Sequence, residues 1–234
     1  MIFLNEQQLS ERLEKVVSYV PAGSRIADIG SDHAYLPCYA VQKGQVDFAI
    51  AGEVVEGPFQ SATKQVQSLD LVKKIAVRKG DGLAVIERED AIETIVIAGM
   101  GGALIRSILE ADSAKLAGVK RLVLQPNIAA HQLREWGEVN QWALVAETIL
   151  REDNKIYEIL VLEPSENALV YSGAERLLGP FLMREKSAVF QAKWGHELNN
   201  WKGIQAKIDA SNAKNAAKLA ELDAKIRIIE DVLR

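Results

Sequence analysis

Two carboxylates flank the glycine of a short loop that follows an apolar run. The run Arg25–Ile29 contains Asp28, and Gly30 and Asp32 follow it. An apolar strand, a glycine turn and the start of a helix together form the frame of a nucleotide-cofactor site. In a dinucleotide loop a second glycine lets the backbone approach a pyrophosphate, and here Asp32 stands at that place. Each carboxylate would repel a phosphate by ~1 kcal/mol or more, even in a high dielectric.

This acidic loop is complementary to a cationic nucleoside. S-adenosylmethionine (SAM) has no phosphate and carries a sulfonium and an ammonium group, which Asp28 and Asp32 would attract. Gly30 would make the turn, because glycine adopts backbone angles that other residues avoid. Ser31 lies within the same loop and is a further candidate cofactor contact. The alternative is an ordinary strand-to-helix turn that Ser31 or Asp32 caps.

Acids also follow the second and third apolar runs. Glu53 lies 25 residues after Asp28, near the spacing at which an acid holds the two ribose hydroxyls of a nucleoside. Asp81 and Gly82 follow the third run. The carboxylate of Asp81 is therefore placed to accept the amino protons of an adenine.

The fourth apolar run ends in the glycine-rich segment Gly99, Met100 and Gly101. Its bare backbone could approach the cofactor and the transferred methyl group. Met100 could pack on the adenine or the target base, or could fill the core. Ligands of open α/β sheets bind at the carboxyl ends of the strands, so these segments, in this order, predict SAM binding.

The apolar runs alternate with helical patterns over the first 165 residues, as in a parallel sheet covered by helices. The expected strands are 25–29, 47–53, 75–79, 94–98, 121–125, 143–150 and 157–162. The expected helices are a leading helix before Pro21 and then 33–43, 56–69, 101–111 and 128–139. The linker between the last two strands is too short for a crossover helix, so these strands pair antiparallel. This outline predicts an α/β fold with the seven-stranded, Rossmann-like sheet of a class I SAM-dependent methyltransferase.

The end of the chain has a different pattern. Apolar residues recur at helical spacing from Phe190 to Ile208, and others step by three and four from Leu219 to Leu233. Asp209–Asn212 lies between them and would form a turn or cap. We predict a methyltransferase domain (1–165) and a helical coiled-coil extension (172–234) built as an antiparallel helix pair. A single long helix or an oligomerising coiled coil is the alternative.

Composition limits the class of protein. The chain has 234 residues, 48% hydrophobic residues and one cysteine, which excludes an internal disulfide and argues against a zinc site. No apolar run approaches a membrane span, and the first residues do not resemble a signal peptide. We therefore expect a cytoplasmic protein without metal, and a monomer or a dimer through the tail. The net charge is −4, yet residues 184–234 carry 10 basic against 7 acidic residues.

Together these motifs resemble the bacterial TrmK family. They are DIGSDHAYLP, the strand that ends in Glu53, GDGL, IAGMGG and LQPN, followed by the helical tail. The resemblance covers essentially the whole chain, and the first loop is its most specific part. It implies a tRNA (adenine-N1)-methyltransferase that acts on adenine 22 in the D-arm of tRNA. By position it implies SAM contacts from the family's motif residues, which are Asp28, Gly30, Asp32, Glu53, Asp81 and Gly99.

The expected chemistry is in-line attack of adenine N1 on the sulfonium methyl group. N1 is largely unprotonated at neutral pH, so catalysis would depend on positioning rather than on a strong general base. N1 lies on the pairing edge, so the base must leave its stack. The candidate residues around it are Asp32, His33, Gln125 and Asn127. Asn127 could bond the base edge or cap the following helix, and His33 could be structural.

Binding of RNA would use basic residues of the tail as a salt-sensitive hold on phosphates. They are Lys186, Lys193, Lys202, Lys207, Lys214, Lys218, Lys225 and Arg227. Arg106, Lys120, Arg121 and Arg134 could add contacts near the site. The alternatives are a SAM-dependent methyltransferase of a small molecule or protein, and a catalytically silent RNA-binding relative. A dinucleotide oxidoreductase is disfavoured by the acidic loop.

Overall fold

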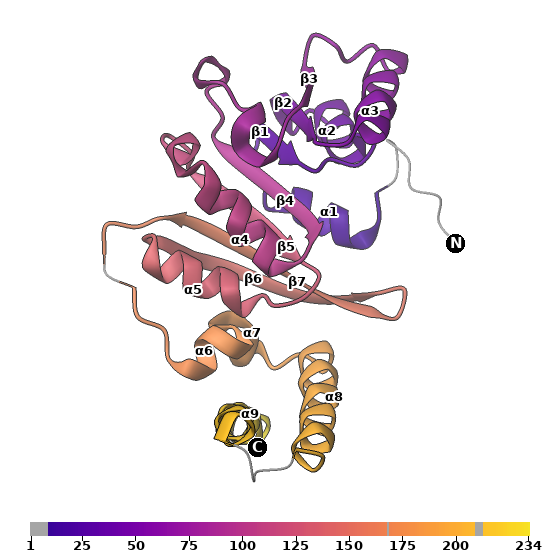
Figure 1. Cartoon of the computed structure of the whole chain (residues 1–234). Helices are drawn as coiled ribbons and strands as arrows, with labels where there is room; N and C mark the ends of the chain where they lie inside the picture. Colours follow the sequence, from indigo (N-terminus) through magenta and orange to yellow (C-terminus); the bar gives the residue numbers. More distant parts are fainter. Residues whose placement is uncertain (1–8, 168, 209–212) are drawn as a thin grey trace.

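A seven-stranded sheet forms the larger part of the structure (Figure 1). The computed structural model describes residues 9–167, 169–208 and 213–234. The strands are β1 (Ser24–Ile29), β2 (Val46–Glu53), β3 (Ile75–Lys79), β4 (Thr94–Met100), β5 (Arg121–Pro126), β6 (Trp142–Glu152) and β7 (Lys155–Pro164). Their order is β3-β2-β1-β4-β5-β7-β6, with β7 antiparallel to both neighbours and the other pairs parallel. The predicted parallel sheet and closing hairpin are confirmed.

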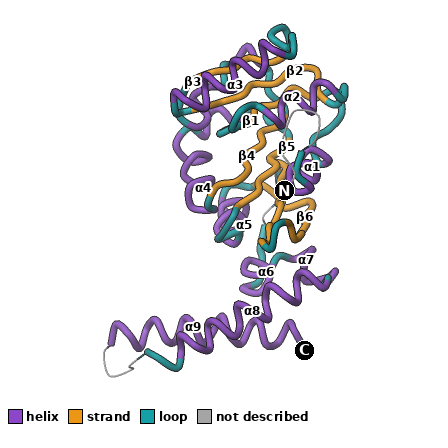
Figure 2. Tube along the Cα trace, turned by 90° about the vertical axis from the view of Figure 1, so that its right-hand side faces the viewer, coloured by secondary structure: helices purple, strands orange, loops and turns teal. Residues whose placement is uncertain are grey.

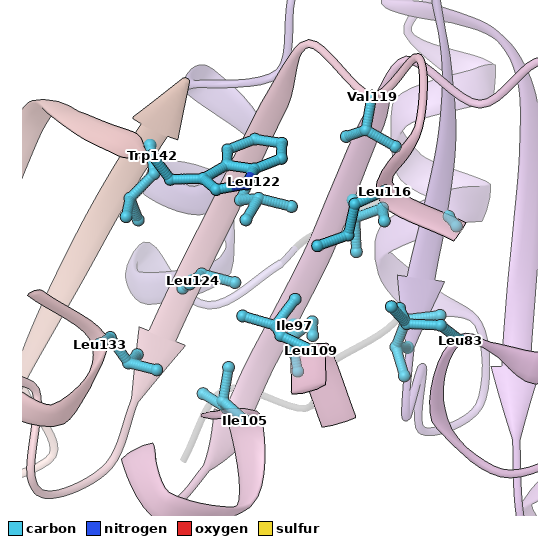
Figure 3. Packing of buried hydrophobic residues seen from close by; sticks show 14 of the residues in the cluster. Leu83, Ile97, Ile105, Leu109, Leu116, Val119, Leu122, Leu124, Leu133 and Trp142 are labelled. Carbon is cyan, nitrogen blue, oxygen red and sulfur yellow. The ribbon is translucent and has the colours of Figure 1, made fainter. Parts of the chain in front are cut away.

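Helices cover both faces of this sheet, because its central strands β1, β4 and β5 bury apolar residues on both sides. The helices α1 (Glu11–Ser18), α2 (Tyr35–Gln42) and α3 (Glu56–Ser68) pack on one face. The helices α4 (Gly102–Ala111) and α5 (His131–Val139) pack on the other. Figure 3 shows this second core, in which Ile105 and Leu109 of α4 meet Ile97 and Leu124 of the sheet. The described residues between β3 and β5 also form the short 3-10 helices η1 (Gly82–Val85), η2 (Arg88–Asp90) and η3 (Ser113–Leu116).

Two helices begin later than predicted. Asp32, His33 and Ala34 have positive φ angles of 41°, 65° and 58°, so the chain is left-handed until α2 starts at Tyr35. Ala129 has a φ of 59°, and α5 likewise starts only at His131. Left-handed residues cannot continue a right-handed helix. Both shifts lie next to predicted site residues.

After the sheet, the described part of the chain is mainly helical (Figure 2). Its helices are α6 (Gly173–Leu178), α7 (Pro180–Glu185), α8 (Ala188–Gln205) and α9 (Ala213–Leu233). Lys202 bonds Glu230 at 2.6 Å, and Gln205 bonds Asp223 at 2.6 Å, so α8 and α9 run antiparallel as predicted. The short helices α6 and α7 were not predicted. Asp209–Asn212 lies outside the described residues, and the coiled-coil geometry and the domain division stay predictions.

A buried ion network joins α5 to this tail. Arg134 of α5 has a fully buried side chain; its Nε donates to Glu147 at 2.7 Å and its Nη2 to Glu158 at 2.6 Å. Its Nη1 also donates to the backbone carbonyl of Leu177 in α6, and Lys193 of α8 donates to Glu158. Burial alone would raise the pKa of Glu158, but Arg134 and Lys193 hold it below its usual value. The predicted contact of Arg134 with RNA is therefore wrong.

Truncating this arginine should destabilise the protein. Arg134→Ala leaves two buried carboxylates without their partner, which costs ~3–5 kcal/mol of unfolding free energy. Urea unfolding followed by tryptophan fluorescence measures the change. Arg106→Ala is the matched control, because its pair with Glu110 is exposed and such pairs contribute ~1 kcal/mol or less. Equal losses for the two variants would contradict the structural role of Arg134.

Candidate active site

The loops after the parallel strands meet at one edge of the sheet. Gly30 follows β1, and its amide donates to the carbonyl of Gly52 in β2 at 2.9 Å. The Asn127 amide after β5 donates to the carbonyl of Met100 at 2.7 Å. Neighbouring parallel strands end on the same side, so the structure brings the predicted loops together.

The carboxyl end of β1 holds a buried carboxyl group. Asp28 is only 4% exposed, and the Ser31 hydroxyl donates to it at 2.7 Å. Burial raises the pKa of Asp28 to about 7; the Ser31 hydrogen bond opposes this rise, and the charges of Glu53 and Asp32 add to it. Ser31 is therefore not a helix cap, and α2 has no side-chain cap, so the alternative of a capped turn is wrong.

Asp32 and His33 belong to the left-handed residues 32–34, which lie in the loop between β1 and α2. A non-glycine residue with positive φ costs about 1–3 kcal/mol and persists only where surrounding contacts enforce it. The Asp32 side chain is 82% exposed, and its Oδ1 lies 3.5 Å from Nε2 of His33. His33 in turn stacks on Tyr35, with ring centroids 5.4 Å apart. Asp32 is free to face a ligand, and His33 has contacts that fix its ring.

Glu53 is a second buried acid beside Asp28. It is 6% exposed, and its Oε1 has no hydrogen-bond partner among the described residues. Burial raises its pKa; the backbone of Asp32 lowers the pKa by donating a hydrogen bond, and the Asp32 charge raises it. An orphaned carboxylate oxygen lacks a donor, and a ribose hydroxyl is such a donor. The residues therefore fit a cationic nucleoside such as SAM.

The remaining predicted cofactor residues lie around this pair. The Gly80 amide donates to the Glu53 carbonyl at 2.9 Å, which brings the exposed Asp81 and the half-buried Gly82 beside the end of β2. Gly30 has a φ of 71°, and a Cβ there would lie 2.2 Å from Cε of Met100. Met100 thus covers the first loop and also packs against the core.

Side-chain amides hold the segment after β4. The buried Gln125 accepts from the Gly99 amide at 3.1 Å, and Nδ2 of Asn127 donates to the Gly99 carbonyl at 2.6 Å. Nε2 of Gln125 also donates to Oδ1 of Asn127 at 3.3 Å. Asn127 does not cap α5, which begins after it with no side-chain cap, so that alternative is wrong. The amides fix the Gly99 peptide in its left-handed conformation, with φ of 80°, and neighbouring Gly101 continues the bare backbone.

Arg12 of α1 was missed by the sequence reasoning. Its Nη1 donates to the same Gln125 oxygen, and Glu152 accepts from its backbone amide at 3.1 Å. Its guanidinium lies 5.1 Å from the centroid of the Tyr157 ring. No spacing in the sequence connects the first helix with the end of β5, so only the fold reveals this contact.

The predicted tail cations differ in their surroundings. Lys207 and Lys218 are exposed, whereas Lys193 donates to the buried Glu158. Lys214 lies in α9, and its side chain is outside the described part of the chain. Their contacts with RNA stay predictions.

Three other predicted cations have ion-pair partners within the chain. Lys120 and Arg121 lie at the amino end of β5, opposite the loops, and bond to Glu93 and Glu163. Their predicted position near the site is wrong. Arg106 bonds Glu110 within α4. Across the described ranges, no group of three or more His, Cys, Asp or Glu is arranged to hold a metal, and no helix there is long and apolar enough to cross a membrane.

The raised pKa of Asp28 predicts opposite effects on stability and binding. The folded protein holds this proton more tightly than the unfolded chain, so the stability contribution falls as pH rises from about 4 to about 7. Asp28→Asn should therefore stabilise the free protein at pH 8, by ~2–4 kcal/mol at ~1.4 kcal/mol per pKa unit. The same variant should weaken SAM binding, because the neutral amide no longer attracts a cation.

Calorimetric titrations with SAM between about pH 6 and about pH 8, together with urea unfolding at each pH, test this expectation. Affinity of the unsubstituted protein should rise with pH as Asp28 loses its proton, and the Asn variant should lack this part of the rise. Unchanged affinity in Asp28→Asn would contradict a contact between Asp28 and the cation.

Comparisons with known proteins give the family. Residues 26–231 match the model of the TrmK family, tRNA (adenine(22)-N(1))-methyltransferase. A Bacillus subtilis tRNA (adenine(22)-N(1))-methyltransferase is 49% identical over 98% of this chain and 99% of its own. The crystal structure of B. subtilis TrmK matches with a TM-score of 0.93 and 46% identity over 97% of this chain and 100% of its own.

A further structure contains the cofactor. Streptococcus pneumoniae Sp1610 in complex with S-adenosyl-L-methionine matches with a TM-score of 0.88 and 44% identity, covering 97% of this chain and all of that one. The match therefore includes the sheet, its site loops and the helical tail. The resemblance that the motifs indicated is confirmed, and the chain belongs to the TrmK family of tRNA (adenine(22)-N(1))-methyltransferases.

Proposed function

We propose that this SAM-dependent enzyme transfers a methyl group to N1 of adenine 22 in tRNA, with the loops at the carboxyl edge of the sheet holding donor and base. The observation that carries this proposal is the buried acid pair Asp28 and Glu53 beside the amide-fixed Gly99 peptide. A cationic nucleoside complements the first feature, and an adenine edge complements the second. Family membership supports the same reaction.

The acids of the first three loops would bind the cofactor. SAM supplies a methyl group on a positively charged sulfur. The unpartnered Glu53 oxygen would accept from the ribose hydroxyls, and Asp81 would accept from the adenine amine. Asp28 would face the cationic end of SAM, while Gly30 gives the backbone room to approach. These assignments follow from position, burial and charge.

The segments after β4 and β5 would position the target base. Asn127 is exposed, and its oxygen would accept from the N6 amine of the adenine. Gln125 is buried and orients both Asn127 and the Gly99 peptide. Adenine N1 needs no strong base, so this orientation provides most of the catalysis. The exposed carboxylate of Asp32 would stabilise the cationic product, and His33 would line the path of the methyl group.

The tail would hold the tRNA outside the pocket. Exposed lysines such as Lys207 and Lys218 provide sequence-independent contacts with phosphates. We propose that the enzyme acts as a monomer. A tRNA substrate supports a cytoplasmic location for the enzyme.

The reaction has a direct test. The enzyme, labelled SAM and an unmodified tRNA transcript should yield labelled 1-methyladenosine by nucleoside mass analysis. A transcript with guanine in place of adenine 22 is the matched control and should incorporate no methyl. Methylation of both transcripts would contradict the assigned position, and another methylated nucleoside would contradict the assigned atom.

The role of Asp81 can be tested separately. Asp81→Ala should weaken SAM binding roughly tenfold, the scale of a lost hydrogen bond to a charged group, and should leave stability unchanged because Asp81 is exposed. Asp47→Ala removes an exposed acid at the other end of the sheet and is the matched control. Calorimetry measures both. Equal affinities for SAM in the two variants would remove Asp81 from the site.

A further inference from the structure

A large apolar side chain stands in solvent next to the proposed base site. Ile128 is 73% exposed and directly follows Asn127. A Cβ on Gly101 would lie 3.8 Å from its Cγ1, so Ile128 borders the glycine segment after β4. Single exposed apolar residues are common on surfaces. The location and the rigidity of this one require an explanation.

The backbone around Ile128 is fixed at several points. The Asn127 amide donates to the Met100 carbonyl at 2.7 Å, and the Gly102 amide donates to the Ile128 carbonyl at 2.9 Å. A Cβ on Gly102 would lie 2.3 Å from the Ala129 oxygen, so only glycine permits this close approach. The left-handed φ of Ala129, 59°, adds strain of about 1–3 kcal/mol that these contacts must hold. The isoleucine is thus presented by a rigid loop.

Beyond Ile128 a cleft of about 740 Å³ opens toward the tail. The segment 127–131, the β6–β7 turn and helices α8 and α9 line it, and Figure 1 shows the turn and α8 on the same side of the molecule. Arg151 and Glu197 line it together with Lys193 and Lys225, which pair with Glu158 and Glu221, and Trp201 contributes an aromatic surface. Cations interleaved with aromatic rings are typical of sites for unstacked nucleic-acid strands.

From this arrangement, and resting on the proposed function, we propose that Ile128 is a wedge that enters the tRNA stack at the place left by the target adenine. Extruding a base costs a few kcal/mol, and apolar side chains inserted between bases compensate for the lost stacking. Ile128 and the proposed base-site residue Asn127 both line the cleft, which would receive the adjoining strand. It touches the neighbouring bases rather than the reacting atoms and is a positioning residue.

Base extrusion can be measured with a tRNA transcript that keeps adenine at position 22 and carries 2-aminopurine at position 23. The fluorescence of the probe rises when adenine 22 leaves the stack beside it. Ile128→Ala should bind this transcript in the presence of SAM but give roughly a tenfold smaller extruded fraction, on the scale of a base–side-chain stacking contact. Val139→Ala is the matched control, because Val139 is 80% exposed at the end of α5. A full fluorescence rise with Ile128→Ala would overturn the proposal.

A second measurement separates a wedge from a simple surface contact. Turnover of Ile128→Ala should fall roughly tenfold on tRNA in which adenine 22 is stacked, and less than twofold where the nucleotide opposite it is abasic, since unstacking is then already easier. Equal losses on both substrates, or no loss on either, would overturn the wedge. Failure of the proposed function is distinct, because the unsubstituted enzyme would then form no 1-methyladenosine on any transcript.

Discussion

The burial of acids without a protein cation is the constraint on which the site depends. Asp28 and Glu53 lie at the ends of neighbouring strands, and no arginine or lysine within the described ranges pairs with either. Two carboxylates in a low dielectric repel each other, and both pKa values are raised. A bound cation with hydroxyl donors would satisfy both groups. The free protein is thus destabilised at the proposed cofactor site.

The same fold contains a second pair of buried acids, and this pair does have a protein cation as its partner. Glu147 and Glu158 share the guanidinium of Arg134, and Lys193 completes the network. These acids are neutralised by the chain itself and connect the sheet to the tail. A buried acid with its own arginine is structural, and a buried acid without one is open to a ligand. This difference distinguishes the acids of the proposed site from acids with a structural role, and it needs no comparison with related proteins.

The sequence predicted the strands well because each is a short apolar run bounded by glycine, proline or charge. It predicted the starts of α2 and α5 less well, since nothing in Asp32–Ala34 or in Ala129 indicates a left-handed backbone that tertiary contacts impose. Arg134 was misplaced because a basic residue in a helix does not indicate which face it occupies. Glu147 and Glu158 within apolar strands were the available signal for its burial. The role of Arg12 depends on a contact between distant segments.

Helix α5 connects these features mechanically. Its interior side chain, Arg134, anchors α6 and α8 through the buried network, and the loop before it carries Asn127 and Ile128 to the rim of the site. Because helices are stiff and the loop is bonded to Gly102, the tail cannot shift without moving this rim. The distance between the lysines proposed to hold phosphates and the proposed base site is therefore set by one helix. Such a fixed spacing would let only an adenine at one distance from the bound phosphates reach the site. Phosphate contacts that do not depend on sequence could in this way still select one position in the tRNA.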